Sequence, residues 1–347
     1  MKRLKIGSKY IGANQPVFII AEAGVNHNGS LELAKQMVDA AKAAGVDAIK
    51  FQTFKPEELV TAAAPTARYQ ERAVSSKSQL RMLKRLELSQ AEFKDIAKYC
   101  QKGKIIFLST PFDRISAEFL YGLNLPLFKI SSGEITNLPF LKQIAKYGKP
   151  IILSTGMCSL SEVREAITTI TSAGNRKIIL LHCTSNYPAD YKHINLQVIN
   201  TLKEEFSLLV GLSDHSLGIE VAIAAVARGA CVIEKHFTLD TALLGPDQKA
   251  SLPATELKKM VKAIRNVEAA LGSSQKKMLA CEKDVARVSR KSLVAARDIA
   301  RGQLITQDAI AIKRPGTGIE PKYLAKVINK KAKHAIKKDQ VLTWAQI

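Results

Sequence analysis

The stretch CVIEKHFTLD, residues 231–240, has the composition of a short buried strand that is interrupted by three polar residues. Successive side chains of a strand point to opposite faces, so Glu234 and His236 share one face and Lys235 takes the other. A lone histidine in such a run is more often a hydrogen-bonded core residue, or part of an edge strand, than a functional group. The rest of the chain has to decide why a carboxylate and an imidazole point the same way.

Seven other β-rich runs occur along the chain, and helical patterns separate them. The eight runs span residues 17–24, 48–53, 105–110, 127–132, 150–155, 178–183, 208–214 and 231–237. One helical pattern, SLELAKQMVDAAKAAG at 30–45, has a serine at its N-cap position and ends at Gly45. Strands that alternate with helices indicate βαβ units and a parallel sheet. Eight such units predict a (β/α)8 TIM barrel, with a doubly wound open sheet as the alternative.

The composition fits a globular protein of the cytoplasm. The 347 residues are 46% hydrophobic, and no apolar run approaches the length of a membrane span. The first residues, MKRLKIGSKYIGANQPVF, contain no continuous apolar segment, so we do not expect a signal peptide. Five cysteines without a CxxC pair fit a reducing compartment rather than a disulfide framework or a zinc site. The net charge of +21 raises the question of nucleic-acid binding, but the basic residues are scattered and lack interleaved aromatic residues. We therefore expect a cytoplasmic protein with neither a nucleic-acid nor a membrane partner.

Polar side chains gather at the carboxyl ends of the eight runs, whereas the amino ends carry mostly aliphatic residues, glycine or proline. Barrel enzymes build their active sites at the carboxyl ends of their strands, so this asymmetry favours a functional site over general loop polarity. The polar residues at these ends are Glu22, Asn26, His27, Lys50, Gln52, Ser109, Thr110, Lys129, Ser131, Ser132, Glu134, Ser154, Thr155, His182, Thr184, Ser185, Tyr187, Ser213, Asp214, His215, Glu234 and His236.

Two kinds of site follow from these residues. Lys50 and Lys129, with several hydroxyls and glycine-containing turns, form the set that a bound phosphate needs. Either lysine alone would more simply be a surface residue with a buried aliphatic stem. His215 and His236 end adjacent strands, and two neutral imidazoles near carboxylates suit a divalent metal with open positions. No HxH or HExxH spacing accompanies them, so spacing alone does not identify a metal site.

Nine segments carry a family resemblance, in order along the chain: AEAGVNHNGS, IKFQTF, FLSTPFD, FKISSGEITNLP, ILSTGM, LHCTSNYP, GLSDHS, EKHFTLD and GPDQKASL. Together they resemble the sialic acid (N-acylneuraminate) synthase family, legionaminate-type members included. The stretch RKSLVAARDIARGQLITQDAIAIKRPGTGI, residues 290–319, resembles the small antifreeze-like (SAF) domain of that family. The resemblance thus implies a barrel domain over 1–272, a linker over 273–284 and a mainly β antifreeze-like domain over 285–347.

The resemblance also implies a reaction. Such enzymes condense phosphoenolpyruvate with an open-chain N-acylated mannosamine-type sugar, which gives a nine-carbon 2-keto acid and phosphate. N-acetylmannosamine and a 2,4-diacetamido-trideoxy hexose, the legionaminate-type precursor, are both open as the sugar. The alternatives are a related phosphoenolpyruvate-dependent synthase of 2-keto-deoxy sugar acids and a pseudaminate synthase.

The family's site residues match positions of this chain. Its divalent ion, Mn²⁺ or Mg²⁺, is bound at the positions of His215 and His236. Its phosphoenolpyruvate contacts match Lys50, Thr110, Lys129, Ser132, Ser154, Ser185 and Ser213, although some relatives have asparagine in place of Ser185. Its sugar contacts match Glu22, Gln52, Tyr187 and Asp247. Arg314 matches an arginine that the antifreeze-like domain inserts into the active site of a partner subunit, which implies a domain-swapped homodimer.

The reaction moves protons, so it requires a carboxylate at the mouth of the barrel. Glu134 is the candidate for proton transfer with the intermediate, and its alternative role is a structural cap for the ITNLP segment. Glu134, Glu22 and the two histidines make up the predicted catalytic group. Glu234 is expected to support either the metal site or Lys129. The stretch that opened this section would then be the eighth strand of a barrel, with its polar face turned into a metal and phosphate pocket.

Overall fold

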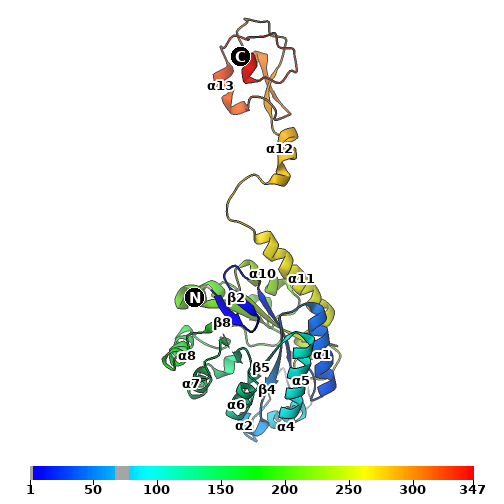
Figure 1. The fold of residues 1–347 in the computed structure, drawn as a ribbon, viewed down its shortest axis with the longest axis vertical. Helices are drawn as coiled ribbons and strands as arrows, with labels where there is room; N and C mark the ends of the chain where they lie inside the picture. The colour runs from blue at the N-terminus through cyan, green and yellow to red at the C-terminus, as the bar shows by residue number, and fades with distance from the viewer. Residues whose placement is uncertain (1–2, 67–77) are drawn as a thin grey trace. The chain divides into compact units, whose positions relative to one another are not determined.

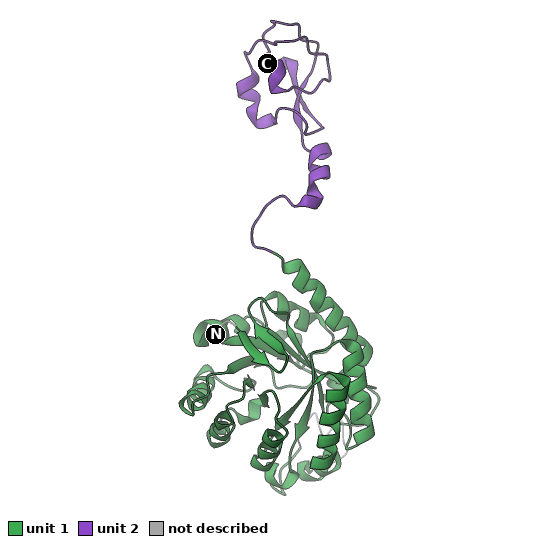
Figure 2. Cartoon of the chain, in the orientation of Figure 1, with its two compact units in different colours: residues 1–272 green, residues 273–347 purple. Residues whose placement is uncertain are grey.

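The computed structural model describes residues 3–66 and 78–347. The chain divides into two units, residues 1–272 and residues 273–347, which Figure 2 colours separately. Each unit has its own buried apolar core. Among the described residues, no helix combines the length and the apolar character that crossing a membrane requires.

Eight parallel strands form the barrel of the first unit (Figure 1). They are β3 (Phe18–Gly24), β4 (Ala48–Thr53), β5 (Ile106–Pro111), β6 (Phe128–Ile130), β7 (Ile151–Ser154), β8 (Ile178–Cys183), β9 (Leu209–Asp214) and β10 (Val232–Thr238). The hydrogen-bonded path runs β5-β4-β3-β10-β9-β8-β7-β6, so the barrel is closed except between β5 and β6. The short strand β11 (Leu252–Pro253) pairs with β10. The predicted (β/α)8 class is confirmed, and each strand overlaps its predicted run.

Helices cover the outside of the barrel (Figure 1). They are α1 (Leu31–Ala44), α2 (Pro56–Leu59), α4 (Gln79–Leu86), α5 (Gln90–Gly103), α6 (Arg114–Gly122), α7 (Leu138–Lys146), α8 (Leu160–Ser172), α9 (Val198–Phe206), α10 (Glu220–Ala227) and α11 (Ala254–Leu271). Ser30 caps α1 by accepting a hydrogen bond from the amide of Leu33, and Gly45 ends the helix in a left-handed conformation. Both ends of this helix thus follow the predicted signals.

The inside of the barrel is apolar at the amino ends of the strands and polar at their carboxyl ends. The apolar part is one buried cluster of Leu4, Ile6, Ile11, Phe18, Ile20, Ala48, Leu108, Leu127, Ile152, Ile179, Leu181 and Val232. Its first three members come from an antiparallel hairpin, β1 (Arg3–Ile6) and β2 (Lys9–Gly12), that the sequence patterns did not predict. Because the hairpin covers the amino end, the carboxyl end is the open mouth of the barrel.

The second unit contains a short antiparallel sheet of β12 (Ser292–Ala295) and β13 (Ile310–Lys313). Isolated bridges such as Val294 with Val341 and Ile299 with Ile336 extend this β structure. The predicted mainly β character of this domain is confirmed. Before the sheet lie the 3-10 turn η4 (Ala280–Glu282) and the helix α12 (Lys283–Ser289), and α13 (Leu324–Val327) follows later. The segment predicted as a linker therefore contains some helical structure.

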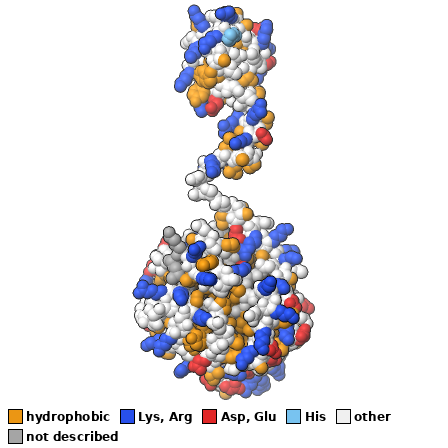
Figure 3. All heavy atoms as spheres, in the orientation of Figure 1, with side chains coloured by type: hydrophobic (Ala, Val, Ile, Leu, Met, Phe, Trp, Pro, Cys, Tyr) orange, Lys and Arg blue, Asp and Glu red, His pale blue; other side chains and the backbone are white. Residues whose placement is uncertain are grey.

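Positive charge is dispersed over the molecular surface. On the face that Figure 3 shows, Lys and Arg side chains are spread over both units, among acidic and apolar side chains. The net charge of +21 is therefore not gathered into one basic patch on this face.

Strand β10 also carries a buried charge on its outer side. Lys235 is 1% exposed, and its Nζ lies 2.6 Å from Asp214 Oδ2 of β9 and donates to the carbonyl oxygen of Ser216 at 2.6 Å. Asp214 also accepts hydrogen bonds from the amide and the hydroxyl of Ser216, at 2.9 and 2.6 Å. The ion pair thus joins β10 to β9. Each of the paired residues is followed directly by a histidine, Asp214 by His215 and Lys235 by His236.

Replacement of Lys235 by methionine should lower the free energy of unfolding by about 3–5 kcal/mol, because Asp214 would stay buried without its cation. Denaturant unfolding followed by circular dichroism measures this change. The control is Lys259→Met, since Lys259 pairs with Glu256 at the surface and exposed pairs contribute only about 0–1 kcal/mol. Equal losses in the two variants would contradict a structural role for the buried pair.

Candidate active site

A cavity of about 300 Å³, the inner chamber, opens at the carboxyl ends of the barrel strands. All eight strands, or the loops that follow them, contribute to its lining. The predicted site residues that line it are Glu22, Lys50, Gln52, Thr110, Lys129, Ser132, Ser154, Ser185, Tyr187, Ser213, His215 and His236. Motifs that are spread over more than 200 residues of sequence therefore converge on one place.

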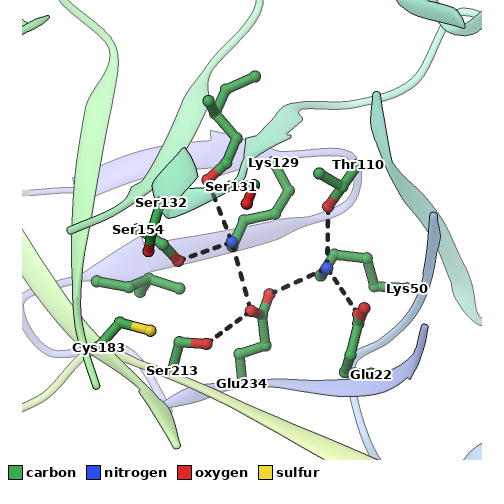
Figure 4. A network of polar contacts seen from close by, with 12 residues as sticks. Glu22, Lys50, Thr110, Lys129, Ser131, Ser132, Ser154, Cys183, Ser213 and Glu234 are labelled. Atoms are coloured by element: carbon green, nitrogen blue, oxygen red, sulfur yellow. Dashed lines mark hydrogen bonds and ion pairs between the residues drawn. The ribbon is translucent and has the colours of Figure 1, made fainter. Parts of the chain in front are cut away.

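Lys50 is one of two buried lysines in this chamber, and a carboxylate lies against it. Its Nζ is 2.7 Å from Glu22 Oε2, donates to Thr110 Oγ1 at 2.9 Å and lies 3.8 Å from Glu234 Oε2. The amide of Gln52 donates to the other oxygen of Glu22 at 3.3 Å. Figure 4 shows that Lys50 is held between Glu22 and Glu234.

Lys129 is the second buried lysine. Its Nζ donates to Ser154 Oγ at 2.7 Å and lies 3.4 Å from Glu234 Oε1, which also accepts the hydroxyl of Ser213 at 2.9 Å. Glu234 therefore lies between the two lysines (Figure 4). Of the two roles predicted for Glu234, the contact with Lys129 is present.

The strand register explains why these groups meet. Glu22 is aligned with Lys50 across β3 and β4, and Glu234 is aligned with Ser213 across β10 and β9. Side chains at positions i and i+2 of a strand face the same way, so Glu234 and His236 both point inward. Each inward position near the mouth is thus next to an inward position of the neighbouring strand.

Burial and the neighbouring charges shift the pKa values of this network. Burial raises the pKa of Glu22 to about 7, although Lys50 opposes the shift. Burial would also raise the pKa of Glu234, but Lys129 and Lys50 outweigh it and hold that pKa below its usual range. Burial lowers the pKa of Lys129, whereas at Lys50 the two carboxylates overcome burial and raise the pKa. The two lysines and the two carboxylates therefore offset the cost of burying one another's charges.

His215 and His236 face each other at the mouth, with ring centroids 5.4 Å apart. His215 Nδ1 donates to the backbone carbonyl of Thr184 at 2.8 Å, which leaves Nε2 as the nitrogen that can bind a metal. The Nδ1 of His236 is buried and has no hydrogen-bond partner, and Asp247 Oδ2 lies 3.8 Å from it. Burial holds the pKa of His236 well below its usual value, so this imidazole is neutral.

This donor set fits a divalent ion that keeps open coordination positions. Two imidazoles with a nearby carboxylate leave coordination positions open. In the described part of the chain, no group of three or more His, Cys, Asp or Glu side chains is arranged to hold a metal by itself. Burial lowers the pKa of His215, but Cys183 and the Thr184 carbonyl outweigh it and raise the pKa, so a metal ion would compete with a proton there.

A second cavity of about 220 Å³, the outer chamber, adjoins the inner one. Gln52, Phe112, Ser131, Tyr187 and His236 line both. The predicted sugar contact Asp247 lines the outer chamber, and burial raises its pKa to about 6.

One predicted site residue of the first unit, Glu134, lines neither chamber. Glu134 is buried, accepts a hydrogen bond from the side chain of Asn137 at 2.7 Å, and has a pKa raised by burial. Asn137 is the N-cap of α7, so this contact is the structural role that the sequence left open for Glu134. Arg314 is exposed and belongs to the second unit.

Several other strand-end residues do not line either chamber. Ser109 forms a hydrogen bond with Thr53 at 2.7 Å, and His182 contacts the backbone carbonyl of Ile194. The side chain of Asn26 donates to the carbonyl of Phe237 at 2.8 Å. Their position at a strand end predicted the right edge of the barrel but not the side on which the side chain lies.

The inner chamber also contains residues that the site prediction missed, namely Phe112, Met157 and Cys183. Gly156 shapes this region without lining it. A Cβ at this position would lie 2.3 Å from Ser185 Oγ and 3.0 Å from Ser132 Oγ, and its amide donates to Ser132 Oγ at 2.8 Å. The STGM motif therefore includes a position where a side chain would compete for space with two predicted phosphate ligands.

The sequence matches the NeuB family over residues 37–276 and the SAF domain over residues 290–347. N,N'-diacetyllegionaminic acid synthase of Legionella pneumophila is 46% identical over 346 residues, which cover 98% of this chain and 97% of that protein. Pseudaminic acid synthase of Campylobacter jejuni is 38% identical over 336 residues, which cover 96% of this chain and 97% of that protein.

Solved structures agree with these matches. The N-acetylneuraminic acid (sialic acid) synthetase of Leptospira borgpetersenii superimposes with a TM-score of 0.73 at 37% identity, over 82% of this chain and 95% of that chain. The chain therefore belongs to the NeuB family, as an enzyme of the synthase type that carries a SAF domain after its barrel.

Proposed function

We propose that this enzyme condenses phosphoenolpyruvate with the open-chain form of an N-acylated mannosamine-type sugar. The products are a nine-carbon 2-keto acid of the sialic-acid type and inorganic phosphate. The names of its relatives support this class, because they describe synthases of legionaminic, pseudaminic and N-acetylneuraminic acids. The observation that carries the proposal is the inner chamber, where two buried lysines and several hydroxyls adjoin a pair of imidazoles.

The anionic substrate has a matching set of donors. We assign its phosphate and carboxylate to Lys50, Thr110, Lys129, Ser132, Ser154, Ser185 and Ser213, all of which line the inner chamber. Ammonium and hydroxyl groups form the charge-assisted hydrogen bonds that such oxyanions need. Before the substrate arrives, Glu22 and Glu234 hold the two lysines in place. The donors are thus positioned without the substrate.

We assign a divalent ion, Mn²⁺ or Mg²⁺, to His215 and His236, where it would polarise the sugar aldehyde as a Lewis acid. Gln52, Tyr187 and Asp247 lie around His236 and would hold the polar groups of the sugar. Because His236 lines both chambers, the aldehyde carbon would meet the vinyl carbon of phosphoenolpyruvate at their junction.

The remaining chemistry needs proton transfer. Attack by the vinyl carbon on the aldehyde leaves cationic character on the phosphate-bearing carbon, and the aldehyde oxygen takes up a proton to become a hydroxyl. Water adds to the cationic carbon and loses a proton, which gives a hemiketal phosphate. Its hydroxyl then loses a proton as the C–O bond to phosphate breaks, which leaves the ketone and releases phosphate. We assign a proton transfer to Glu22 because it lines the inner chamber. Glu134 stays the second candidate, since its neighbours Ser131 and Ser132 line that chamber. A larger loss of kcat in Glu134→Gln than in Glu22→Gln would return the role to Glu134.

We also propose that Arg314 completes the sugar site of a second copy of the chain in a domain-swapped homodimer. Arg314 follows β13 directly and its side chain is exposed. A guanidinium forms directed hydrogen bonds with carbonyl and hydroxyl oxygens, which suits an acylamino sugar.

Purified protein with Mn²⁺ should release phosphate from phosphoenolpyruvate only when an N-acylated mannosamine-type sugar is present, and mass spectrometry should find the 2-keto acid. In His236→Ala, we expect turnover to fall by about 10³-fold or more, because Lewis-acid activation contributes several kcal/mol. Mn²⁺ binding followed by electron paramagnetic resonance should weaken in parallel. Phosphate release that needs no sugar would overturn the function, and full turnover of His236→Ala after chelation would overturn the metal assignment.

Replacement of Lys129 by methionine should raise the KM for phosphoenolpyruvate by about 10- to 100-fold, because a hydrogen bond to a charged group contributes about 1.5–3 kcal/mol. The KM for the sugar should change little. Steady-state kinetics with each substrate varied in turn measures both constants. The surface variant Lys259→Met is the control and should match the wild type. Equal rises for the two substrates would indicate that Lys129 is a structural residue instead.

The role of Arg314 across subunits is testable by complementation. His236→Ala and Arg314→Ala should each be nearly inactive alone, and a mixture of the two should regain up to about a quarter of wild-type activity, because half of a random mixture forms mixed dimers with one intact site. Activity is measured after native mass spectrometry confirms subunit exchange. If mixed dimers form and activity stays at the level of the parents, Arg314 does not act on a neighbouring subunit.

A further inference from the structure

Three rings from three successive strands meet at the mouth of the barrel. Tyr187, in the loop after β8, stacks on His215, which follows β9, with ring centroids 4.1 Å apart and an angle of 27° between the ring planes. Tyr187 also meets His236 of β10 edge to face, at 84° and with centroids 5.6 Å apart. The two imidazoles are 5.4 Å apart at 70°. Each ring is thus a neighbour of the other two.

The loop that carries Tyr187 is fastened to His215 at two points. His215 Nδ1 donates to the backbone carbonyl of Thr184 at 2.8 Å, and the carbonyl of His215 accepts a hydrogen bond from the amide of Ala189 at 2.8 Å. Tyr187 lies between these two anchors in the sequence. The stacked ring is therefore held in place by the same segment that orients the imidazole of His215.

His236 lacks the hydrogen bond that usually orients a metal-binding imidazole. Histidines that bind a metal generally donate the other ring N–H to a carbonyl or a carboxylate, which fixes the plane of the ring. The Nδ1 of His236 is buried and has no such partner, and Asp247 Oδ2 at 3.8 Å is too far for a hydrogen bond. Packing therefore has to set the orientation of this ring, and Tyr187 is packed against it.

We propose that Tyr187 is a positioning residue whose aromatic ring holds the planes of His215 and His236, so that both imidazoles stay available to one divalent ion. The ring, and not the hydroxyl, carries this role. A contact between the hydroxyl and the sugar is compatible with it. The inference rests on the proposed function, because it takes the metal assignment of the two histidines from it.

The physical reason lies in the small number of ligands. Two imidazoles supply only part of a coordination sphere, so the freedom that their rings lose when the ion binds weighs heavily on the affinity. Stacked and edge-to-face contacts between rings reduce that loss because they order the rings beforehand. An imidazole that binds a cation also gains positive charge, which the face of a tyrosine ring attracts.

The test is a titration of the purified enzyme with Mn²⁺ alone, followed by electron paramagnetic resonance and without either substrate. In Tyr187→Leu, the Kd for Mn²⁺ should rise by about 10- to 100-fold, the usual effect of losing a group that orients a ligand. In Tyr187→Phe, which keeps the ring and loses the hydroxyl, the Kd should stay at the wild-type value. An equal rise in both variants would assign the effect to the hydroxyl and overturn the role of the ring.

Activity provides a second readout. Because mass action fills a weakened site, the kcat of Tyr187→Leu should rise with the Mn²⁺ concentration until it matches that of Tyr187→Phe, which lacks the same hydroxyl. A loss of kcat that Mn²⁺ does not restore, together with an unchanged Kd, would make Tyr187 a substrate contact alone and overturn the inference.

The matched control is Tyr121→Leu. Tyr121 of α6 stacks on Tyr147, with centroids 4.4 Å apart, so this variant also loses a stacked tyrosine, but on the helices outside the barrel. Its Kd for Mn²⁺ should match the wild type. Circular dichroism checks that each variant is folded, and Tyr187→Met makes the same comparison if Tyr187→Leu does not fold.

The outcomes separate this inference from the proposed function. If the wild type binds Mn²⁺ and a folded Tyr187→Leu or Tyr187→Met binds it equally well, the inference fails while the metal assignment stands. If the wild type binds no Mn²⁺, the metal assignment fails and the inference fails with it.

Discussion

The burial of two ammonium groups inside a protein is the constraint on which this structure depends. Lys50 and Lys129 are almost inaccessible to water, and a buried charge is tolerated only with a partner of opposite sign and good geometry. Glu22 and Glu234 meet that requirement from the facing strands. Because each partner must point inward, every strand that carries one has its register fixed, since a slip of one residue would turn the charge toward the helices.

The same constraint divides the barrel into two halves. Apolar side chains fill the amino half, where the β1–β2 hairpin covers the end, and the charged groups occupy the carboxyl half beside the open mouth. Strand β10 has important side chains on both its inward and its outward face. Its inward residues Glu234 and His236 belong to the mouth, and its outward residue Lys235 fastens β10 to β9 through Asp214. Rigidity behind the site and chemistry within it thus come from one strand.

Sequence patterns predicted the barrel and most of the inner chamber, because strand periodicity and motif order are local properties of the chain. They missed short elements and the directions of individual side chains. The β1–β2 hairpin is too short and too rich in lysine to show a pattern, and α4 has only eight residues. The alternation of side chains along β8 predicts the face on which His182 lies. The search for polar residues at the strand ends did not use this alternation. The contact of Glu134 with Asn137 depends on a side-chain rotamer, which no sequence pattern encodes.

Gly156 has a consequence for how this sequence can change over evolutionary time. Its backbone conformation is one that other residues adopt readily, so the restriction at this position is one of space and not of flexibility. Even alanine, the smallest step away, would force Ser185 to rotate. Substitutions at Gly156 are therefore not neutral, even though this residue itself takes part in no chemistry. Such positions escape a search for reactive residues, although a side chain there would displace residues that line the inner chamber.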